Sequence, residues 1–460
     1  AKEYEVEITR FADRKSGRPV YKIGPIEFDQ TKCIDCRNCL EICQKQSGGF
    51  LELTGRGYEI GITPSADTQK DCLYCGQCIV HCPVGAIEAE GEFEEIEKPL
   101  LDAAKTVVVQ FAPSIRSSIG EMFDLPPGAI MEGQLVAGLK QLGFKKVFDT
   151  AVSADFTTIE EANELVERLK NNGVLPMFTS CCPAWVRYVE FFRPDLIPNL
   201  TTARSPQSMF GGLIKTFWAQ KQNLKPSDIV VVSIMPCTAK KYDVVKEDNY
   251  IDGSKRIDYV LTTRELGRLL AKHNIDLKNL APLPADQPFS EYSGAGVIYG
   301  AAGGVMESAI RTACWQITGK NPQQIEYQAV RGIVGLKTAE IAFGDLKIKI
   351  AAANGMENAR EVLAILDKNP KSFDYIEIMA CPGGCIGGGG QPLPVSDEIR
   401  RQRAAALYQI DCAKTIRFAH DNPAVINIYE EFFGKDKEKI HKILHTNYLP
   451  KPKTAIQQIR

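Results

Sequence analysis

Eight cysteines between positions 33 and 82 form two runs of identical spacing, and this repeat constrains the fold more than any other feature of the chain. Each run reads C-x2-C-x2-C-x3-C: Cys33-Ile-Asp-Cys36-Arg-Asn-Cys39-Leu-Glu-Ile-Cys43, then Cys72-Leu-Tyr-Cys75-Gly-Gln-Cys78-Ile-Val-His-Cys82. Clustered cysteines in a large intracellular chain more often bind metal or carry out redox chemistry than form disulfides. The repeat therefore predicts metal clusters near the N-terminus.

The spacing is that of the bacterial ferredoxins, in which the fourth cysteine of each run ligates the other cluster. It predicts two [4Fe–4S] clusters, one held by Cys33, Cys36, Cys39 and Cys82 and the other by Cys72, Cys75, Cys78 and Cys43. Zinc is a weaker alternative, because four-ligand zinc sites usually pair two C-x2-C units. Gln44 replaces the usual proline after the first run, and residues 44–71 look like an insertion, but neither departure removes a ligand.

A glycine-rich stretch, Met379-Ala-Cys-Pro-Gly-Gly-Cys-Ile-Gly-Gly-Gly-Gly-Gln-Pro392, carries another pair of cysteines. The apolar run 375–379 reads as the end of a buried strand, so Cys381 and Cys385 follow a strand end. Glycines let the backbone approach a bulky object and offer amide N–H groups to its anions. We expect a metal cluster held against bare backbone. The alternative is a glycine-rich turn with two free buried thiols.

Two further apolar runs, 174–178 and 229–234, read as buried strands that end just before cysteines. The first run is followed by Cys181 and Cys182, and the second by Cys237. Open α/β sheets place their sites at the carboxyl ends of strands, so these thiols should converge with the two of the glycine-rich stretch. Five thiols would meet where a cubane needs four, and the residue pattern leaves open whether Cys181 or Cys182 is the spare.

Other elements of the pattern complete an α/β organisation. Residues 107–111 read as a buried strand that ends at Ala112-Pro113-Ser114, and residues 133–142 read as a helix. A second helix should begin at a cap formed by Thr157 or Thr158. Further expected elements are one or two hairpins in residues 1–30, an acidic linker over 92–97, and helices over 397–413 and 430–444.

Several side chains with ligand chemistry lack partners at ligand spacing. We interpret Cys314 and Cys412 as buried free thiols. His81 is interpreted as a packing or solvated residue, because the neighbouring cysteines already fill both clusters. His441 and His445 stand at i and i+4, but no carboxylate or cysteine pattern accompanies them, so we expect a surface pair.

The overall composition excludes several classes of function. The chain has 460 residues, and its net charge of −2 favours neither a nucleic-acid nor a membrane partner. No segment approaches the roughly 20 apolar residues that span a bilayer. The first residues, Ala-Lys-Glu-Tyr-Glu-Val-Glu, contain neither a signal-peptide core nor a twin-arginine start, so a cytoplasmic location is expected.

Three cysteine motifs together resemble those of the [FeFe]-hydrogenases. They are Thr179-Ser-Cys-Cys-Pro-Ala-Trp185, Met235-Pro-Cys-Thr-Ala-Lys240 and Met379-Ala-Cys-Pro-Gly-Gly-Cys385. The resemblance extends through Phe289-Ser-Glu-Tyr-Ser-Gly-Ala-Gly296 and Gly303-Gly-Val-Met-Glu307, and it covers essentially the whole chain. It implies a ferredoxin-like α+β domain at 1–100, an α/β catalytic domain of two sheet-containing lobes at 101–392, and a helical C-terminal wrap at 393–460.

The resemblance also implies the H-cluster, a [4Fe–4S] cubane joined through one cysteine sulfur to a two-iron centre with CO, CN⁻ and a bridging dithiolate amine. By position, Cys182, Cys237, Cys381 and Cys385 ligate the cubane, and Cys385 provides the bridge. Cys181 becomes the spare thiol and the first proton donor and acceptor. Residues expected around the two-iron centre are Ala112, Pro113, Ser114, Pro206, Gln207, Met235, Lys240, Met379 and Tyr299. Lys240 and Ser114 should hydrogen-bond cyanides, and Tyr299 stands where the family often has Phe.

The resemblance implies a proton route as well. Glu161 and Glu164 lie at i and i+3 and can face one way from a helix, with Arg168 one turn further on. Thr201 stands where the family usually has serine between the two acids, and its hydroxyl can still relay a proton. Without the motif match, these glutamates would read as a solvated helix face.

Together these features predict an enzyme that catalyses 2H⁺ + 2e⁻ ⇌ H2. Electrons would come from a ferredoxin or similar carrier through the N-terminal clusters, and maturation proteins would supply the two-iron centre. The main alternative is a non-catalytic iron–sulfur assembly or sensor protein without that centre. Cys181, Lys240 and the methionines favour the enzyme, because cubane ligation does not require them. A nucleotide-binding electron-transfer subunit is disfavoured by the absence of a G-x-G-x-x-G or P-loop motif.

Overall fold

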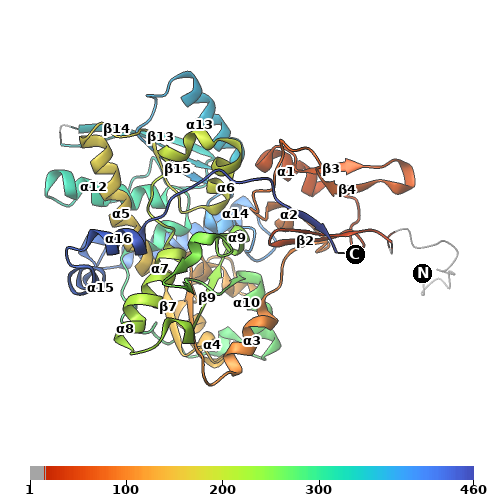
Figure 1. Cartoon of the computed structure of the whole chain (residues 1–460), viewed down its shortest axis with the longest axis horizontal. Helices are drawn as coiled ribbons and strands as arrows, with labels where there is room; N and C mark the ends of the chain where they lie inside the picture. The colour runs from red at the N-terminus through yellow and green to blue at the C-terminus, as the bar shows by residue number, and fades with distance from the viewer. Residues whose placement is uncertain (1–14, 16, 345, 460) are drawn as a thin grey trace.

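Two four-stranded sheets organise residues 105–392 of the computed structural model, which describes residues 15, 17–344 and 346–459 (Figure 1). In the first sheet the order is β12-β9-β6-β7 and all neighbours are parallel. Its strands are β6 (Thr106–Phe111), β7 (Lys146–Asp149), β9 (Ile229–Met235) and β12 (Tyr259–Thr262). Helices cover a parallel sheet on both faces, which explains why its strands are nearly continuous runs of Val and Ile.

The second sheet has the order β13-β14-β15-β8. Its strands are β8 (Met177–Phe178), β13 (Leu336–Phe343), β14 (Leu346–Asn354) and β15 (Tyr375–Met379). Strands β14, β15 and β8 run parallel, and β13 is antiparallel to β14. The strand predicted at 375–379 is confirmed, whereas the one predicted at 174–178 shortens to two residues. Pro176 has no N–H for the ladder, so pairing starts only after it.

The helices pack around these sheets and confirm the sequence pattern in most places. They are α4 (Glu132–Gln141), α5 (Thr150–Lys170), α6 (Pro183–Phe192), α7 (Pro206–Leu213), α8 (Ala219–Lys221), α9 (Ala239–Asp243), α10 (Thr263–Lys272), α11 (Gly294–Val297), α12 (Gly304–Thr318) and α13 (Met356–Lys368). The prediction that Thr157 or Thr158 caps a helix is wrong. Asp149 caps α5 through the N–H of Ala151, and both threonines lie inside the helix, where their hydroxyls donate to carbonyls one turn back.

The N-terminal part is a small α+β unit that contains both cysteine runs. It comprises β1 (Val20–Ile23), β2 (Ile26–Asp29), α1 (Asn38–Ser47), β3 (Leu51–Thr54), β4 (Gly61–Pro64), α2 (Gln77–Val80) and β5 (Ile87–Ala89). The predicted early hairpin is β1–β2, while its possible extension over residues 1–14 and 16 lies outside the described residues. The insertion forms a β3–β4 hairpin. The acidic stretch is not an extended linker: most of it belongs to helix α3 (Phe93–Leu101), which packs through Ile96.

The C-terminal part adds α14 (Asp397–Ala413), α15 (Pro423–Ile428), α16 (Lys437–Leu444) and β16 (Ile456–Gln458). The predicted helix at 397–413 is confirmed. The one predicted at 430–444 is interrupted, because a π-turn at Tyr429–Phe433 ends at Gly434 in a left-handed conformation (φ 54°). The tail then crosses the molecule, and β16 pairs antiparallel with β1 (Figure 1).

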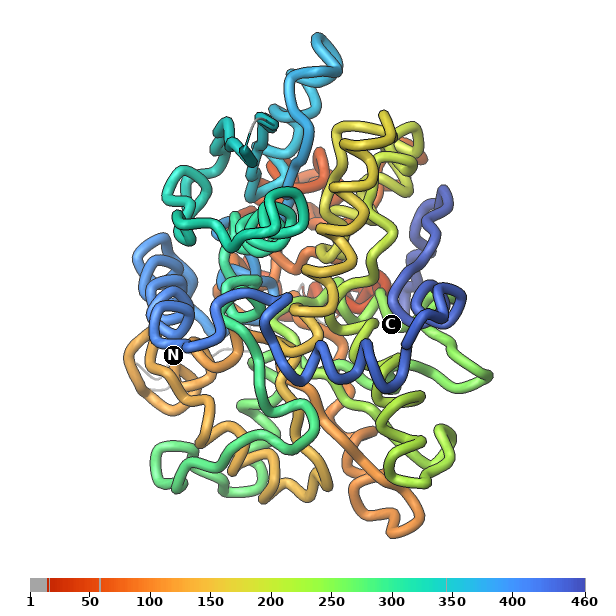
Figure 2. The backbone as a smooth tube through the Cα atoms, turned by 90° about the vertical axis from the view of Figure 1, so that its left-hand side faces the viewer, coloured from red at the N-terminus to blue at the C-terminus, as the bar shows by residue number. Residues whose placement is uncertain are grey.

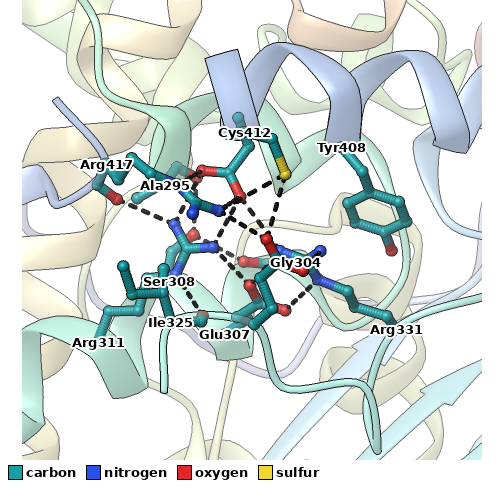
Figure 3. Close-up of polar contacts among 12 residues, drawn as sticks. Ala295, Gly304, Glu307, Ser308, Arg311, Ile325, Arg331, Tyr408, Cys412 and Arg417 are labelled. Carbon is teal, nitrogen blue, oxygen red and sulfur yellow. Dashed lines mark hydrogen bonds and ion pairs between the residues drawn. The ribbon is translucent and has the colours of Figure 1, made fainter. Parts of the chain in front are cut away.

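A buried charge cluster fastens α14 to α12 (Figure 3). Asp411 accepts hydrogen bonds from Arg311, Arg331 and Arg417, and Glu307 accepts from the first two of these. Cys412, on the same helix, is exposed, which corrects the prediction of a buried thiol. Cys314 is buried as predicted. None of the described helices is long and apolar enough to cross a membrane.

Candidate functional site

The carboxyl ends of both sheets border one cavity, and cysteines dominate its wall. The loops after β8, β9 and β15 bring Cys181, Cys182, Cys237, Cys381 and Cys385 to it. The remaining lining includes Ala112, Pro113, Ser114, Thr150, Pro206, Gln207, Met235, Lys240, Tyr299 and Met379. The structure thus brings to one cavity every residue that the sequence assigned to the cubane and to the two-iron centre.

Local chain geometry sets the direction of these thiols. Helix α6 begins with Pro183 at its first position, so Cys182 precedes it in an extended conformation. Gly384 has φ 88°, and a Cβ there would lie 2.7 Å from the backbone nitrogen of Ala302. Only glycine therefore fits at position 384, directly before Cys385. In the described part of the chain no three His, Cys, Asp or Glu side chains converge closely enough to hold one metal ion, so these thiols surround a space rather than a point.

The glycine tail after Cys385 has a packing role that the sequence did not indicate. A Cβ on Gly388 would lie 2.2 Å from the carbonyl oxygen of Pro236, and one on Gly389 would lie 2.5 Å from that of Cys75. The glycines therefore let three backbone segments pack against one another. This packing joins the N-terminal unit to the wall of the cavity.

Two polar groups of the cavity wall are buried without partners. Ser114 Oγ and Gln207 Oε1 form no hydrogen bond with any described residue. The Lys240 ammonium is nearly buried, and among the described residues its hydrogen bond is a long one of 3.5 Å to Asp243. The Ser114 hydroxyl and the Lys240 ammonium are donors, and donors left free in an apolar cavity fit a bound group that presents small anionic acceptors.

The electrostatics of the thiols fit metal ligation. Burial raises the pKa of Cys237 to about 12, and burial raises the pKa of Cys381 well above its ordinary value. Such thiols remain protonated at neutral pH unless a cation replaces the proton. An iron cluster bearing acceptor ligands therefore fits the thiols, the free hydroxyl and the lysine of this cavity.

The N-terminal cysteines form two separate groups. Cys43, Cys72, Cys75 and Cys78 line a second cavity, whose apolar wall includes Phe28, Phe50 and Ile87. Burial raises the pKa of Cys39 to about 12, and the nearby thiols of Cys33, Cys82 and Cys36 raise it as well. This grouping is the exchange of fourth cysteines expected from the ferredoxin spacing. His81 bonds through Nδ1 to the carbonyl of Gln77.

The second cavity lies directly behind the first. The carbonyl of Cys75 is 3.9 Å from Cys381 Sγ, and Thr238 Oγ1 donates to the carbonyl of Tyr74 at 2.6 Å. Gln77 Nε2 donates to the carbonyl of Gly387 at 2.9 Å. Cys36 is the exposed member of the other group. The two groups and the main cavity thus form a series from the protein surface inward.

On the opposite side of the main cavity, Glu161 lies near Cys181. The carboxylate is fully buried on α5, its Oε1 accepts from Tyr375 Oη at 2.9 Å, and its Oε2 has no partner among the described residues. Burial raises the pKa of Glu161 to about 8. Burial raises the pKa of the Cys181 thiol, and the negative charge of the nearby Glu161 raises this pKa further. Tyr299 Oη bonds to Thr158 at 2.9 Å.

Glu164 lies further out on α5 and has several partners. Its Oε2 accepts from Thr201 Oγ1 at 2.7 Å, and its Oε1 accepts from Arg168 Nη2 at 2.5 Å. The backbone N–H and Oγ1 of Thr202 also donate to Oε2, at 2.8 and 3.0 Å. The structure thus joins Glu164, Thr201 and Arg168, whereas no direct hydrogen bond links Glu161 to them in the described chain.

The sequence reasoning missed three residues beside these acids, Tyr375, Thr202 and His445. His445 is only partly exposed: its side chain is 13% exposed and bonds to Glu160 and Thr202, which corrects the prediction of a surface pair for this histidine, whereas His441 is exposed as predicted. A second hydroxyl next to Thr201 was visible in the sequence. Nothing in the sequence connects a histidine in the last helical segment with α5.

Family comparisons agree with this arrangement. Models described as "Iron only hydrogenase large subunit, C-terminal domain", "Iron hydrogenase small subunit" and "4Fe-4S dicluster domain" match residues 105–389, 397–451 and 32–86. The NADP-reducing hydrogenase subunit HndD of Solidesulfovibrio fructosivorans is 41% identical over 434 residues, which cover 91% of this chain and 74% of that protein. A variant of the [FeFe]-hydrogenase HydA1 from Chlamydomonas reinhardtii has a TM-score of 0.71 at 36% identity, covering 78% of this chain and 99% of that one.

The chain is also similar to a protein that is named for iron–sulfur assembly rather than for hydrogenase activity. Cytosolic iron-sulfur assembly component 3 of Mus musculus is 30% identical over 433 residues, covering 90% of each chain. Its identity is lower than that of HndD.

Proposed function

The chain belongs to the iron-only ([FeFe]-) hydrogenase family and is a hydrogenase, and we propose that it catalyses 2H⁺ + 2e⁻ ⇌ H2 at an H-cluster in the five-cysteine cavity. One observation carries the proposal. The cavity combines four thiols for a cubane with a fifth thiol, a free serine hydroxyl and a lysine that cubane ligation does not require. When bound, the cluster supplies the iron at which H2 is formed or split.

The residues around the cavity fit the roles of ligand and anchor. We assign Cys182, Cys237, Cys381 and Cys385 to the cubane, with Cys385 bridging to the two-iron centre. Lys240 and the free Ser114 hydroxyl supply donors for cyanide ligands, since charge-assisted bonds are strong where water is excluded. The apolar side chains of the wall, Pro113, Pro206, Met235, Tyr299 and Met379, with Ala112, keep water away.

Protons move on the side of Cys181. The thiol lies at the cavity wall, and the buried Glu161 behind it has a pKa raised to about 8, so its carboxyl holds a proton at neutral pH and can donate it. Thr201 and Glu164 continue the route outward, and Arg168 holds the outer carboxylate. The Oε2 atom of Glu161 has no partner among the described residues. A water molecule bound there would connect Glu161 to Thr201 by hydrogen bonds.

Electrons arrive from the opposite side. The exposed Cys36 marks the outer [4Fe–4S] site, and Cys75 of the inner site contacts Cys381 of the cavity. This series supports entry of electrons from a ferredoxin or similar carrier at the N-terminal unit. Cytoplasmic action and maturation proteins that deliver the two-iron centre belong to the same proposal.

The alternative is an iron–sulfur assembly protein without a two-iron centre, which the similarity to cytosolic iron-sulfur assembly component 3 brings forward. Infrared spectra of anaerobically matured protein under H2 and under CO, with an H2-evolution assay, separate the two. Gas-sensitive bands of metal-bound CO and CN⁻ together with turnover are expected. Full cubane loading after confirmed maturation, without such bands, would establish the assembly-type function instead.

A further inference from the structure

His445 connects the C-terminal segment to the proton-bearing side of α5. It follows α16, which lies beside α5 in both views (Figures 1 and 2). Its Nδ1 is 2.9 Å from Thr202 Oγ1, and its Nε2 is 2.9 Å from Glu160 Oε2. Thr202 Oγ1 in turn donates to Glu164 Oε2 at 3.0 Å. A continuous chain of hydrogen bonds therefore runs from Glu164 through Thr202 to His445.

The chain of hydrogen bonds ends at a large surface pocket of about 680 Å³. Its wall contains both ends of the chain, Glu164 and His445, so water in the pocket can exchange protons with the imidazole. The other ionisable or hydrogen-bonding groups that face this space are Glu160, Asn163, Glu167, Thr202, Tyr429, Lys437 and His441. Tyr429 Oη also donates to Glu160.

We propose that His445 is a proton-exchange residue that passes protons between this pocket and Glu164 through Thr202, in parallel with direct exchange at Glu164, which also lines the pocket. The inference rests on the proposed function, since it extends the proton route of that site. Histidine suits the task because its two nitrogens can accept and donate on opposite sides near neutral pH. The Arg168 guanidinium has only N–H donors, so it holds the Glu164 carboxylate but offers no acceptor for a proton relay.

The transfer balances at each atom. During H2 formation, Nε2 of a neutral His445 accepts a proton from pocket water or from Glu160, and Nδ1–H passes its proton to Thr202 Oγ1. The Thr202 hydroxyl gives its own proton to Glu164 Oε2. One proton enters and one leaves, and exchange with pocket water restores the starting tautomer of the imidazole. During H2 oxidation the same steps run in reverse.

The test compares His445→Gln, Thr202→Val and His273→Gln in the fully matured protein. Glutamine keeps both hydrogen bonds of His445 but cannot carry a proton, while valine interrupts the link to Glu164. His273 bonds to Glu97 on another surface and serves as a matched control. H2 evolution is measured in dilute and concentrated buffer across pH 5.5–9, with and without added imidazole.

We expect His445→Gln and Thr202→Val to lose about threefold to tenfold of turnover in dilute buffer, because direct exchange between pocket water and Glu164 remains. Imidazole or concentrated buffer should restore most of the loss in His445→Gln, and His273→Gln should behave as wild type. Wild-type turnover in His445→Gln at every pH and buffer strength would overturn the proposal. A loss that imidazole does not restore, together with a lowered unfolding midpoint, would make His445 a structural residue and overturn it equally.

A second readout does not depend on turnover. In unmatured protein, ¹⁵N spectra of histidine should show that Thr202→Val changes the chemical shift of His445 Nδ1, because its hydrogen bond to Thr202 Oγ1 is lost. An unchanged shift would refute the coupling. Absence of CO and CN⁻ bands and of turnover in the matured wild type would refute only the hydrogenase reaction, so the two failures are distinguishable.

Discussion

The carbonyl oxygen of Cys75 lies 3.9 Å from the sulfur of Cys381, so the N-terminal cluster loop contacts the wall of the five-cysteine cavity. Gly389 makes this approach possible, because it lies against the same carbonyl and the space there is too small for a Cβ atom. The distance between the N-terminal cysteines and the cavity is therefore set by backbone packing rather than by long side chains.

Gly389→Ala is expected to disturb this junction. Its Cβ would lie 2.5 Å from the Cys75 carbonyl, so backbone must shift at a cost of about 1–3 kcal/mol, typical of overpacking. We expect a lower unfolding midpoint and slower ferredoxin-linked turnover. Gly91→Ala is the control, since the nearest atom to its Cβ is a ring carbon of Phe93 at 3.5 Å. Equal stability and rates in the two variants would show that the junction tolerates the side chain.

Cys181→Ser should retain cluster loading and lose most turnover. The thiol lines the cavity beside Glu161 but is not needed to complete the cubane set. Loss of a positioned proton donor costs roughly 10²–10⁴-fold in rate. Iron content, infrared bands and H2 evolution are measured together, with the exposed Cys412→Ser as control. Normal turnover in a fully loaded Cys181→Ser variant would remove this residue from the proton route.

The effect of a Thr201 substitution on turnover should depend on whether the new side chain keeps a hydroxyl. Thr201 Oγ1 donates to Glu164 at 2.7 Å, so Thr201→Ser should keep most activity and Thr201→Val should lose it. Glu164→Gln should also slow turnover without changing cluster spectra, because its carboxylate lies outside the cavity wall. Rates and infrared spectra of the three variants check this. Full activity of Thr201→Val would contradict a relay through the hydroxyl.

Glu161 should make the protein less stable as pH rises. Burial raises the pKa of this carboxyl to about 8 in the folded state, against an ordinary value near 4.5, so the folded protein binds more protons between these values. The free energy of unfolding should therefore fall with pH across this window. Denaturation of wild type and Glu161→Gln at several pH values measures it. The variant should show a flatter profile, and parallel profiles would mean that Glu161 titrates normally.

Asp411→Asn should be strongly destabilising. Asp411 accepts from Arg311, Arg331 and Arg417 in the buried cluster of Figure 3, and removing its charge leaves these three cations facing Glu307 and the partly exposed Glu326. Breaking a buried ion pair typically costs about 3–5 kcal/mol. Urea unfolding measures the change. Its control is Glu431→Gln, an exposed partner of Lys221, for which a change within about 0.5 kcal/mol is expected.

The sequence predicted those features of the fold and of the site that depend on residues close together in the chain. Buried strands such as 375–379 and 229–235 were legible as apolar runs, and the cysteines at their ends line one cavity. The two cysteine runs indicated their exchanged grouping because loop spacing restricts which thiols can meet. The cap of α5 was missed, since Asp149 belongs to the preceding strand and Thr157 is a better cap only in isolation.

The sequence by itself thus indicated which cysteines meet at one cavity and which strands deliver them, because period, spacing and strand ends are local properties, while the family resemblance implied the other wall residues. Only the tertiary structure decided which distant groups touch. It placed His445 against Thr202, set Gly389 against Cys75 and exposed Cys412. Such contacts follow from how sheets and helices pack across hundreds of residues, and no local pattern encodes them.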